Sequence, residues 1–245
     1  GLGDVYKRQI QVTSAGLDRV PLDYCKAHGI TVYNAGGVYS APMAEFVLGG
    51  ILQLYKESKF FAENQAAHRW EKHRGLRELS GKTACIIGTG SVGSAIARRL
   101  RAFDVQTVGM NRSGHPASEF DQTQPICRLD DLLPLADLVI CAMPLTAETA
   151  GLFDSVRLAK IKPGAVFVNV ARGKVTDQQA LAEALQSGQL SGAVLDVFEE
   201  EPLPRSSPLW DMEQAILTPH NSFVGEHNGE RLFRLICKNL ESFAQ

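Results

Sequence analysis

Residues 83–100 read TACIIGTGSVGSAIARRL, and this stretch decides the fold. An apolar run typical of a buried strand leads into Gly88, and a helical pattern begins at Ser91. Gly88 allows a tight turn, Gly90 a close approach of the backbone to a ligand, and Gly93 close packing of the helix on the strand. Because a helix N-terminus favours negative charge, the stretch predicts a site for the pyrophosphate of a dinucleotide. The residues expected to contact it are Gly88, Gly90, Ser91, Val92 and Gly93.

Strand-like and helical patterns alternate downstream of this stretch. Strands rich in Val, Ile and Leu that alternate with helices indicate an α/β fold with a doubly wound parallel sheet. Besides the strand at 83–87, strands are predicted at 105–110, 138–142, 165–170, 192–197 and 215–218, and helices at 91–103, 130–135, 155–160, 177–187 and 230–243.

Upstream the pattern is strand, turn, helix and strand, followed by a long helix. Strands are predicted at 10–13 and 30–33, helices at 21–28 and 41–68, and a linker or irregular helix at 63–78. The first nine residues, GLGDVYKRQ, fit no part of this pattern. We interpret them as foreign sequence, with a short native tail as the alternative.

The composition is that of an ordinary globular protein. Of the 245 residues 44% are hydrophobic and 21% are charged, and the net charge is -2. This balance predicts neither a nucleic-acid surface nor a membrane patch, and the longest nearly uncharged run, residues 46–55, is far too short to span a bilayer. The five widely spaced cysteines form no CxxC pair, so we expect no disulfide framework, no metal site and a reducing cytoplasm. Cys85 and Cys141 are expected in the core.

Three polar residues of the C-terminal half each follow a short apolar run. They are Arg172, Glu201 and His220, and each is expected to project from a strand end into a cleft. A guanidinium binds a carboxylate through two parallel hydrogen bonds, and an imidazole exchanges protons near neutral pH. With a carboxylate to hold the imidazole, these groups beside a nicotinamide can reduce a 2-keto acid.

In their residues and in their order along the chain, these motifs resemble those of the D-isomer-specific 2-hydroxyacid dehydrogenase family. This family includes glyoxylate/hydroxypyruvate reductases and phosphoglycerate dehydrogenases. The resemblance covers the chain from Ile10 onward. It implies a Rossmann cofactor domain, residues 45–224, inserted in a flavodoxin-like substrate domain made of residues 10–44 and 225–245. Those two segments are short for a domain, so we expect an N-terminally truncated fragment that is poorly soluble and nearly inactive.

The resemblance also implies roles for residues around the cleft. Glu201, which directly precedes a proline, would hold His220, while Glu199 and Glu200 would be surface residues. Backbone N–H groups at Ala15 and Gly16 would bind the substrate carboxylate. Tyr39 and Trp70 are candidate pocket walls. Further cofactor contacts are implied for Pro144, Thr149, Val170, Ala171 and Asp196, the last to the nicotinamide carboxamide.

The residue that reads the adenosine ribose is expected about 20 residues after Gly88. The sequence there is Asn111-Arg112-Ser113, whereas relatives that prefer NAD carry an acid. A carboxylate would repel a 2′-phosphate, but an Arg beside a hydroxyl and an amide would bind one. NADP is therefore the predicted cofactor and NAD the second choice. The alternative is that Arg112 stacks on the adenine without a charge preference.

The resemblance further implies a two-fold homodimer formed through the long helix and the segment after it. An apolar stripe on this helix would face the partner, or else the chain's own core. The stripe consists of Ala44, Val47, Leu48, Ile51, Leu52 and Tyr55.

The predicted function is hydride transfer between NADPH and a small 2-keto or 2-hydroxy acid whose side chain the sequence does not identify. The alternative from another class is a nucleotide-sensing corepressor of the same fold that acts by docking partners. Formate dehydrogenases share the scaffold but pair the histidine with Gln, so Glu201 argues against that activity.

Overall fold

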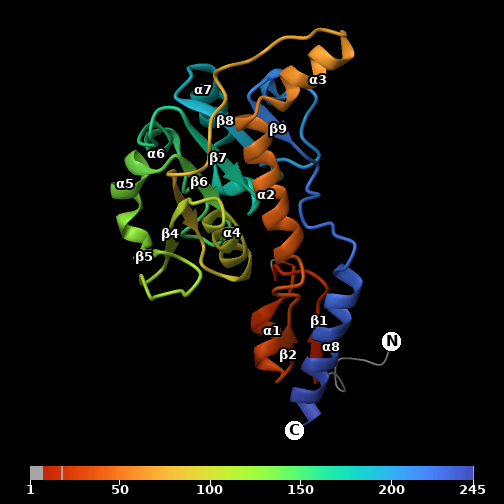
Figure 1. The fold of residues 1–245 in the computed structure, drawn as a ribbon. Helices are drawn as coiled ribbons and strands as arrows, with labels where there is room; N and C mark the ends of the chain where they lie inside the picture. Colours follow the sequence, from red (N-terminus) through yellow and green to blue (C-terminus); the bar gives the residue numbers. More distant parts are fainter. Residues whose placement is uncertain (1–7, 18, 245) are drawn as a thin grey trace.

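A seven-stranded parallel sheet forms the larger body of the molecule (Figure 1). The structure is a computed structural model that describes residues 8–17 and 19–244. The interpretation of the first nine residues as foreign falls mainly on residues 1–7, which lie outside the described part. The strand order is β5-β4-β3-β6-β7-β8-β9. The strands are β3 (Thr83–Ile87), β4 (Gln106–Asn111), β5 (Gln122–Pro125), β6 (Leu138–Cys141), β7 (Ala165–Asn169), β8 (Leu190–Leu195) and β9 (Ala215–Leu217).

Helices cover both faces of this sheet, as a doubly wound fold requires. Successive side chains of a strand point to opposite faces, and the two cores follow this alternation. Ile86 packs with α2 and α4 on one face, whereas Cys85 and Ile87 pack with α5, α6 and α7 on the other. The elements are α2 (Ser40–Tyr55), α4 (Ser91–Arg101), α5 (Leu129–Leu132), α6 (Ser155–Ala159) and α7 (Gln178–Gln186), with 3-10 turns η2 (Ile126–Arg128), η3 (Leu133–Leu135), η4 (Gly173–Val175) and η5 (Pro208–Asp211).

The two ends of the chain form a smaller unit beside the large sheet (Figure 1). Strands β1 (Gln9–Gln11) and β2 (Thr31–Tyr33) pair in parallel, and α1 (Leu22–Ala27) connects them. Helix α8 (Asn228–Ala244) returns to this unit, where Arg231 Nε donates to the Val38 carbonyl at 2.7 Å and Asn239 Nδ2 donates to Gln11 Oε1 at 2.6 Å. The division at residues 44/45 and 224/225 remains a proposal, and α2 crosses its first boundary.

The helix expected over residues 41–68 is two helices. Helix α2 ends at Tyr55 and α3 (Ser58–Ala66) follows, and Glu57 between them has a left-handed backbone with φ 51°. A left-handed residue cannot continue a right-handed helix, so the axis breaks there. Strand β5 was not expected, because its residues, QTQP, are polar and it lies at the sheet edge. Other element ends differ from the sequence prediction by a residue or two.

The apolar stripe of α2 is buried in the chain's own core. Ala44, Val47 and Ile51 have no exposed surface, and the stripe packs with residues of α4 and of the sheet. The expectation that this stripe faces a partner subunit is therefore wrong. Its helical spacing serves burial on the sheet instead.

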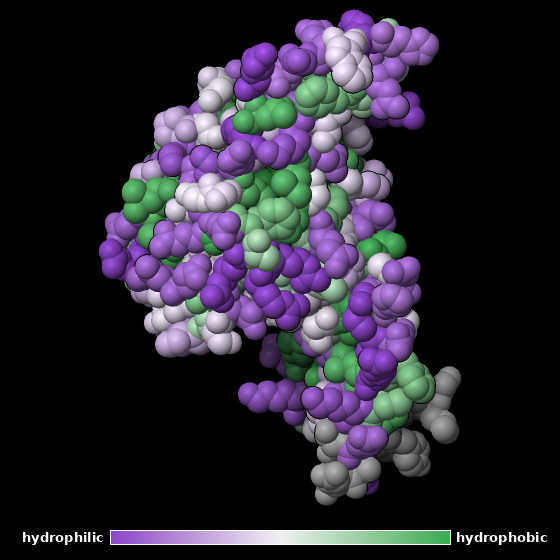
Figure 2. Space-filling model, in the orientation of Figure 1, coloured by the Kyte–Doolittle hydropathy of each residue, from purple (hydrophilic) through white to green (hydrophobic). Residues whose placement is uncertain are grey.

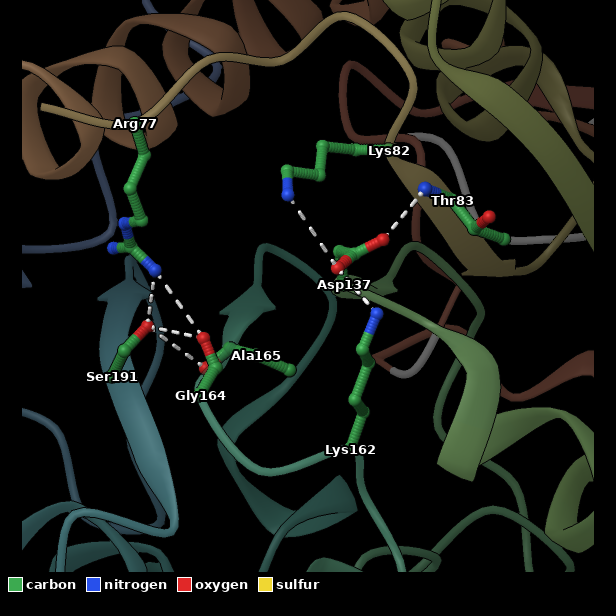
Figure 3. A network of polar contacts seen from close by, with 8 residues as sticks. All are labelled: Arg77, Lys82, Thr83, Asp137, Lys162, Gly164, Ala165 and Ser191. Atoms are coloured by element: carbon green, nitrogen blue, oxygen red, sulfur yellow. Dashed lines mark hydrogen bonds and ion pairs between the residues drawn. The ribbon is translucent and has the colours of Figure 1, made fainter.

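A polar network joins the strands at the amino-terminal edge of the sheet (Figure 3). Asp137, just before β6, accepts from Lys162 Nζ at 2.8 Å and from the backbone N–H of Thr83 at 3.0 Å, and Lys82 Nζ lies 4.0 Å away. Burial raises the pKa of the Asp137 carboxyl, but the hydrogen bonds from Lys162 and Thr83 and the two lysine charges outweigh this, so the pKa is lowered overall. The network thus links the starts of β3 and β6 to the turn before β7.

The conversion of Asp137 to Asn (Asp137→Asn) is expected to lower the free energy of unfolding at pH 7. The change removes the charge that faces both lysines while one oxygen still accepts from Thr83. A charge-assisted hydrogen bond contributes about 1.5–3 kcal/mol, and solvent screening at the half-exposed lysines reduces this to about 1–2 kcal/mol. Urea denaturation followed by circular dichroism measures the difference.

The contribution of Asp137 to the free energy of unfolding depends on pH with a defined sign. The folded pKa lies below the unfolded value of about 3.9, so the contribution of Asp137 is fully present above that value and is lost as the pH falls through the folded pKa. Asp131→Asn is the matched control, because Asp131 pairs with Arg128 at 3.0 Å on an exposed surface. It should change stability by less than about 0.5 kcal/mol. Equal losses for the two variants would contradict the role of the network.

Candidate active site

Two glycines, one in the turn after β3 and one in the first turn of α4, could not be replaced by any other residue without a shift of the backbone. Gly88 has φ 110°, and a Cβ there would lie 2.6 Å from the carbonyl oxygen of Ala142. A Cβ at Gly93 would lie 1.9 Å from the carbonyl oxygen of Gly88. A Cβ at Gly90, by contrast, would meet nothing within 4 Å, so open space lies in front of the first turn of α4. A bare helix N-terminus beside open space fits the pyrophosphate of a dinucleotide.

A cleft of about 820 Å³ opens beside this turn, between the carboxyl ends of the large sheet and the smaller unit. Figure 2 shows the molecule hollowed between these two parts. The structure brings together in its wall nine residues that the sequence suggested, namely Ala15, Gly16, Tyr39, Val92, Pro144, Val170, Ala171, Arg172 and His220.

His220 and Glu201 are hydrogen-bonded at this cleft. His220 Nδ1 lies 2.8 Å from Glu201 Oε2, and Glu201 Oε1 accepts from the backbone N–H of Phe198 at 3.1 Å. Because a carboxylate can only accept, the proton of a neutral ring belongs on Nδ1, which leaves Nε2 for a substrate. Glu199 accepts instead from the first backbone N–H of α7, on Gln178, at 2.8 Å. Glu201 is therefore the acid of this run that reaches the imidazole.

Arg172 follows β7 and is held by its own loop. Asn169 Oδ1 accepts from the N–H of Ala171 at 3.0 Å, and Asn169 Nδ2 donates to the carbonyl of Arg172 at 3.1 Å. A Cβ at the next residue, Gly173, would lie 1.8 Å from the backbone carbon of Phe198. The Arg172 loop therefore packs directly on the segment that leads to Glu201.

Asp196, at the end of β8, is completely buried. Its carboxylate accepts from Thr218 Oγ1 at 2.6 Å and from the backbone N–H groups of Asn221 and Ser222 at 2.7 and 3.0 Å. All three donors belong to the loop that carries His220. The carboxylate expected to contact a carboxamide is thus enclosed by that loop.

Asn111, at the end of β4, shapes the turn expected to read the ribose. Its Oδ1 accepts from the N–H of Gly114 at 2.6 Å, and its Nδ2 donates to the carbonyl of His115 at 2.9 Å. These bonds leave Arg112 and Ser113 exposed on the turn. The side chain of Asn111 therefore holds the loop, while its two neighbours are exposed on the turn.

A carboxylate lies within electrostatic reach of Arg112. The pKa of the Glu148 carboxyl is lowered first by the hydrogen bond from the Thr146 hydroxyl, then by its own backbone N–H, and to a smaller extent by Arg112.

In the same loop, Thr149 Oγ1 donates to the carbonyl of Pro144 at 2.8 Å and accepts from the N–H of Thr146 at 2.7 Å. The hydroxyl of Thr149, expected at the cofactor, thus closes its own turn.

The two aromatic residues suggested as pocket walls lie in different places. Tyr39 lines the cleft, and its hydroxyl donates to the carbonyl of Thr13. Trp70 is 97% exposed and lies in the segment after α3, away from the cleft, so its assignment to the pocket is wrong.

Several cleft residues were missed by the sequence reasoning. Phe223 lines the cleft and meets the His220 ring edge-on, with ring centroids 6.3 Å apart. Asn34 Nδ2 donates to the carbonyl of Ala15 at 2.8 Å. The position of Phe223 in the loop after β9 could have indicated it, but nothing local to Asn34 or Met43 marks them as cleft residues.

Within residues 8–17 and 19–244, no helix has the length and apolar character needed to cross a membrane. The same residues contain no group of three or more His, Cys, Asp or Glu side chains suited to a metal ion. The five cysteines are all free thiols, and burial raises the pKa of Cys85 to about 12. Cys85 and Cys141 are buried, as expected.

Comparison with known proteins supplies the family. The family model described as "D-isomer specific 2-hydroxyacid dehydrogenase, NAD binding domain" matches residues 48–222. The chain is 38% identical to D-3-phosphoglycerate dehydrogenase of Mycobacterium tuberculosis over 84% of its own length and 39% of that protein. It is 35% identical to glyoxylate reductase of Thermofilum pendens over 94% of its own length and 70% of that protein.

A solved structure with the same fold is the NADPH-dependent glyoxylate/hydroxypyruvate reductase of Sinorhizobium meliloti, in complex with NADP and sulfate. It superposes with a TM-score of 0.82 at 27% identity, over 97% of this chain and 75% of that one. The likeness confirms the α/β fold predicted from the strand and helix pattern. From the matched cofactor domain and the shared fold, the chain belongs to the D-isomer-specific 2-hydroxyacid dehydrogenase family.

Proposed function

We propose that this protein reduces small 2-keto acids with NADPH and oxidises the matching 2-hydroxy acids in the reverse direction. The observation that carries the proposal is the 2.8 Å contact between His220 Nδ1 and Glu201 Oε2 at a cleft that Arg172 also lines. A 2-keto acid carries a carboxylate, which a cation can bind, and a carbonyl oxygen, which a proton donor can protonate on reduction. This cleft offers both a cation and a proton donor. The relatives named as glyoxylate reductase and D-3-phosphoglycerate dehydrogenase support the same chemistry.

Each of the three side chains has a distinct task in this proposal. Arg172 binds the substrate carboxylate and stabilises negative charge that develops on the keto oxygen. His220 delivers a proton from Nε2 to that oxygen and takes it back in the oxidation. Glu201 holds Nδ1, fixes the tautomer and stabilises the imidazolium. Backbone N–H groups at Ala15 and Gly16 would complete the carboxylate site.

The cofactor would lie along the carboxyl edge of the sheet. A nicotinamide cofactor, when bound, supplies the hydride for the carbonyl carbon. The turn from Gly88 to Gly93 would hold its pyrophosphate, and Arg112 with Ser113 would hold a 2′-phosphate. Val170, Ala171 and Pro144 line the cleft where the nicotinamide half would enter. The NADP in the Sinorhizobium relative supports the preference for a phosphorylated cofactor.

The homodimer proposal gives up the buried stripe of α2 and keeps the remainder of the surface first expected, the end of the long helix and the segment after it. Helix α3 and the irregular segment after it, residues 56–76, form an arm that extends from the body (Figure 1). The arm exposes Phe61, Trp70 and Leu76, three large apolar side chains. We propose that this arm binds a second copy of the chain, because such exposed apolar groups are typical of interfaces. The cytoplasm remains the expected compartment, in keeping with five free thiols.

His220→Gln tests the proton donor. The variant is expected to lower kcat for keto-acid reduction at least about 100-fold, the usual contribution of a general acid, while the Kd for NADPH stays unchanged. His227→Gln is the matched control, since the ring of His227 is exposed and pairs with Glu226 at 3.1 Å. Near-normal turnover by folded His220→Gln would refute the assignment.

Arg112→Asp tests the cofactor preference. The change removes a charge-assisted hydrogen bond to the 2′-phosphate, a contribution of about 1.5–3 kcal/mol, and adds a like charge. The ratio of kcat/KM for NADPH to that for NADH should therefore fall about tenfold or more. Arg128→Asp, at a surface pair with Asp131, should leave the ratio unchanged. A wild-type protein that prefers NADH would overturn the NADPH proposal.

Trp70→Glu tests the arm as a dimer interface. Light scattering at micromolar concentration should give the mass of two chains for the wild type and of one chain for the variant, because a buried charge disfavours association. Leu135→Glu is the control, since Leu135 is also a large apolar residue, 62% exposed, but lies in η3, outside the arm. A monomeric wild type, or a control that also dissociates, would count against the arm.

A further inference from the structure

We propose that His115 completes the binding site for the 2′-phosphate of NADPH, beside Arg112 and Ser113, and that its ring takes up a proton when the phosphate binds. This role rests on the proposed preference for NADPH. It adds to that preference a third side chain and a dependence of NADPH affinity on pH that NADH does not share.

The turn that carries these three side chains is fixed from both sides. Asn111 Oδ1 accepts from the N–H of Gly114 at 2.6 Å, and Asn111 Nδ2 donates to the carbonyl of His115 at 2.9 Å. The same Nδ2 donates to Thr89 Oγ1 at 3.2 Å, which ties the turn to the glycine loop expected to hold the pyrophosphate. A Cβ at Gly114 would lie 2.8 Å from Cδ of Pro125, so the turn packs directly on the end of β5. A turn fixed in this way loses little freedom when a ligand binds.

The imidazole of His115 lies against the hydroxyl of Ser113, with 3.2 Å between Nδ1 and Oγ. Both residues and Arg112 are exposed. A guanidinium, a hydroxyl and an imidazole therefore share one open turn. A phosphate monoester has three strong acceptor oxygens, so it can accept from all three groups, and its bonds to charged donors are the strong ones.

Two arrangements of hydrogens fit the contact between Ser113 and His115. In the first, the hydroxyl donates to an unprotonated Nδ1 and the neutral ring carries its proton on Nε2. In the second, Nδ1 has taken a proton from solvent and donates to Oγ, and the hydroxyl hydrogen is free to donate to a phosphate oxygen. A 2′-phosphate bound by this hydroxyl carries a charge of about −1.5 to −2. Since a nearby negative charge favours the imidazolium, phosphate binding selects the second arrangement.

The charged groups of the surrounding segments set the background for this proton. The turn itself contributes Arg112, which opposes a second positive charge. Glu119 and Asp121 follow in the chain, but Asp121 is paired with Arg101 at 3.1 Å. Glu148, in the loop after β6, lies within electrostatic reach of Arg112. The glycine loop and β5, whose sequence is QTQP, contain no charged residue. The 2′-phosphate is therefore a large new negative charge at this turn, and NADH brings none there.

Two variants separate the proton from the hydrogen bond. His115→Asn places an amide where Nδ1 stood, so it can still bond to Ser113 but cannot take up a proton. His115→Ala removes both properties. His28→Asn is the matched control, because His28 is also exposed and its Nδ1 lies 2.9 Å from the carbonyl of Tyr24, just after α1 in the smaller unit.

Isothermal calorimetry gives the Kd for NADPH and for NADH at about pH 6 and about pH 8, on either side of the middle of the range in which an imidazole titrates. At the lower pH, the wild type and His28→Asn should bind NADPH about tenfold more tightly than either His115 variant, the usual effect of a hydrogen bond to a charged group. At the higher pH, the wild type and His115→Asn should agree within about twofold, because the ring is then largely neutral. The Kd for NADH should stay within about twofold throughout, which also shows that the variants are folded.

The same titrations in two buffers of different ionisation enthalpy count the protons taken up. The 2′-phosphate itself titrates near about pH 6, so the difference between the wild type and His115→Asn isolates the proton of the ring. We expect the wild type to take up more protons with NADPH at about pH 7 than His115→Asn does, and the two to agree with NADH.

Three results would overturn or divide the proposals. If both His115 variants bind NADPH as the wild type does while Arg112→Asp binds it more weakly, the role of His115 is wrong and the NADPH preference stands. Equal proton uptake by the wild type and His115→Asn would likewise refute the proton on the ring. A wild type that binds NADPH no better than NADH at both pH values would refute the NADPH preference and this role together. Turnover of no 2-keto acid, with the His115 effects present, would refute only the proposed reaction.

Discussion

A backbone contact at the end of β3 governs the layout of the molecule. The carbonyl of Gly88 lies against Gly93, and Gly88 itself lies against the main chain of Ala142 at the end of β6. No side chain separates these segments, so α4 begins directly at the strand end and its first N–H groups face open space. The neighbouring parallel strands end at the same edge, and the loops that carry Arg112, Arg172 and His220 start there.

Polar residues at these strand ends hold the loops that carry the candidate site residues. Asn111 closes the turn that exposes Arg112, Asn169 holds the loop of Arg172, and Asp196 holds the loop of His220. A polar residue at the end of β4, at the end of β7 and directly after β8 thus holds a loop by hydrogen bonds. A short amide or carboxylate satisfies backbone N–H groups that a loop would otherwise leave unpaired. Of the longer side chains on these loops, those of Arg172 and His220 line the cleft and that of Arg112 is exposed.

The two sides of the cleft differ in how they are supported. One wall is the carboxyl edge of a sheet whose strands are joined at their opposite ends by Asp137 and its partners. The other wall is the loop around Ala15, held by Asn34 and by the hydroxyl of Tyr39 at Thr13. Helix α2 runs between them with its apolar stripe in the core of the large sheet, which ties the smaller unit to the cofactor half.

The sequence by itself determined the parallel α/β fold, the glycine turn and the run of residues that ends in His220, because periodicity and glycine spacing are local properties. It also identified Glu201, which the structure joins to His220 at 2.8 Å. Only the tertiary structure decided where the α2 stripe is buried, where the long helix breaks at Glu57, that Trp70 lies outside the cleft and that Asp196 is enclosed. These properties depend on which surfaces and hydrogen-bond donors from distant segments meet, and a helical period or a strand-end aspartate is the same in sequence whichever partner it finds.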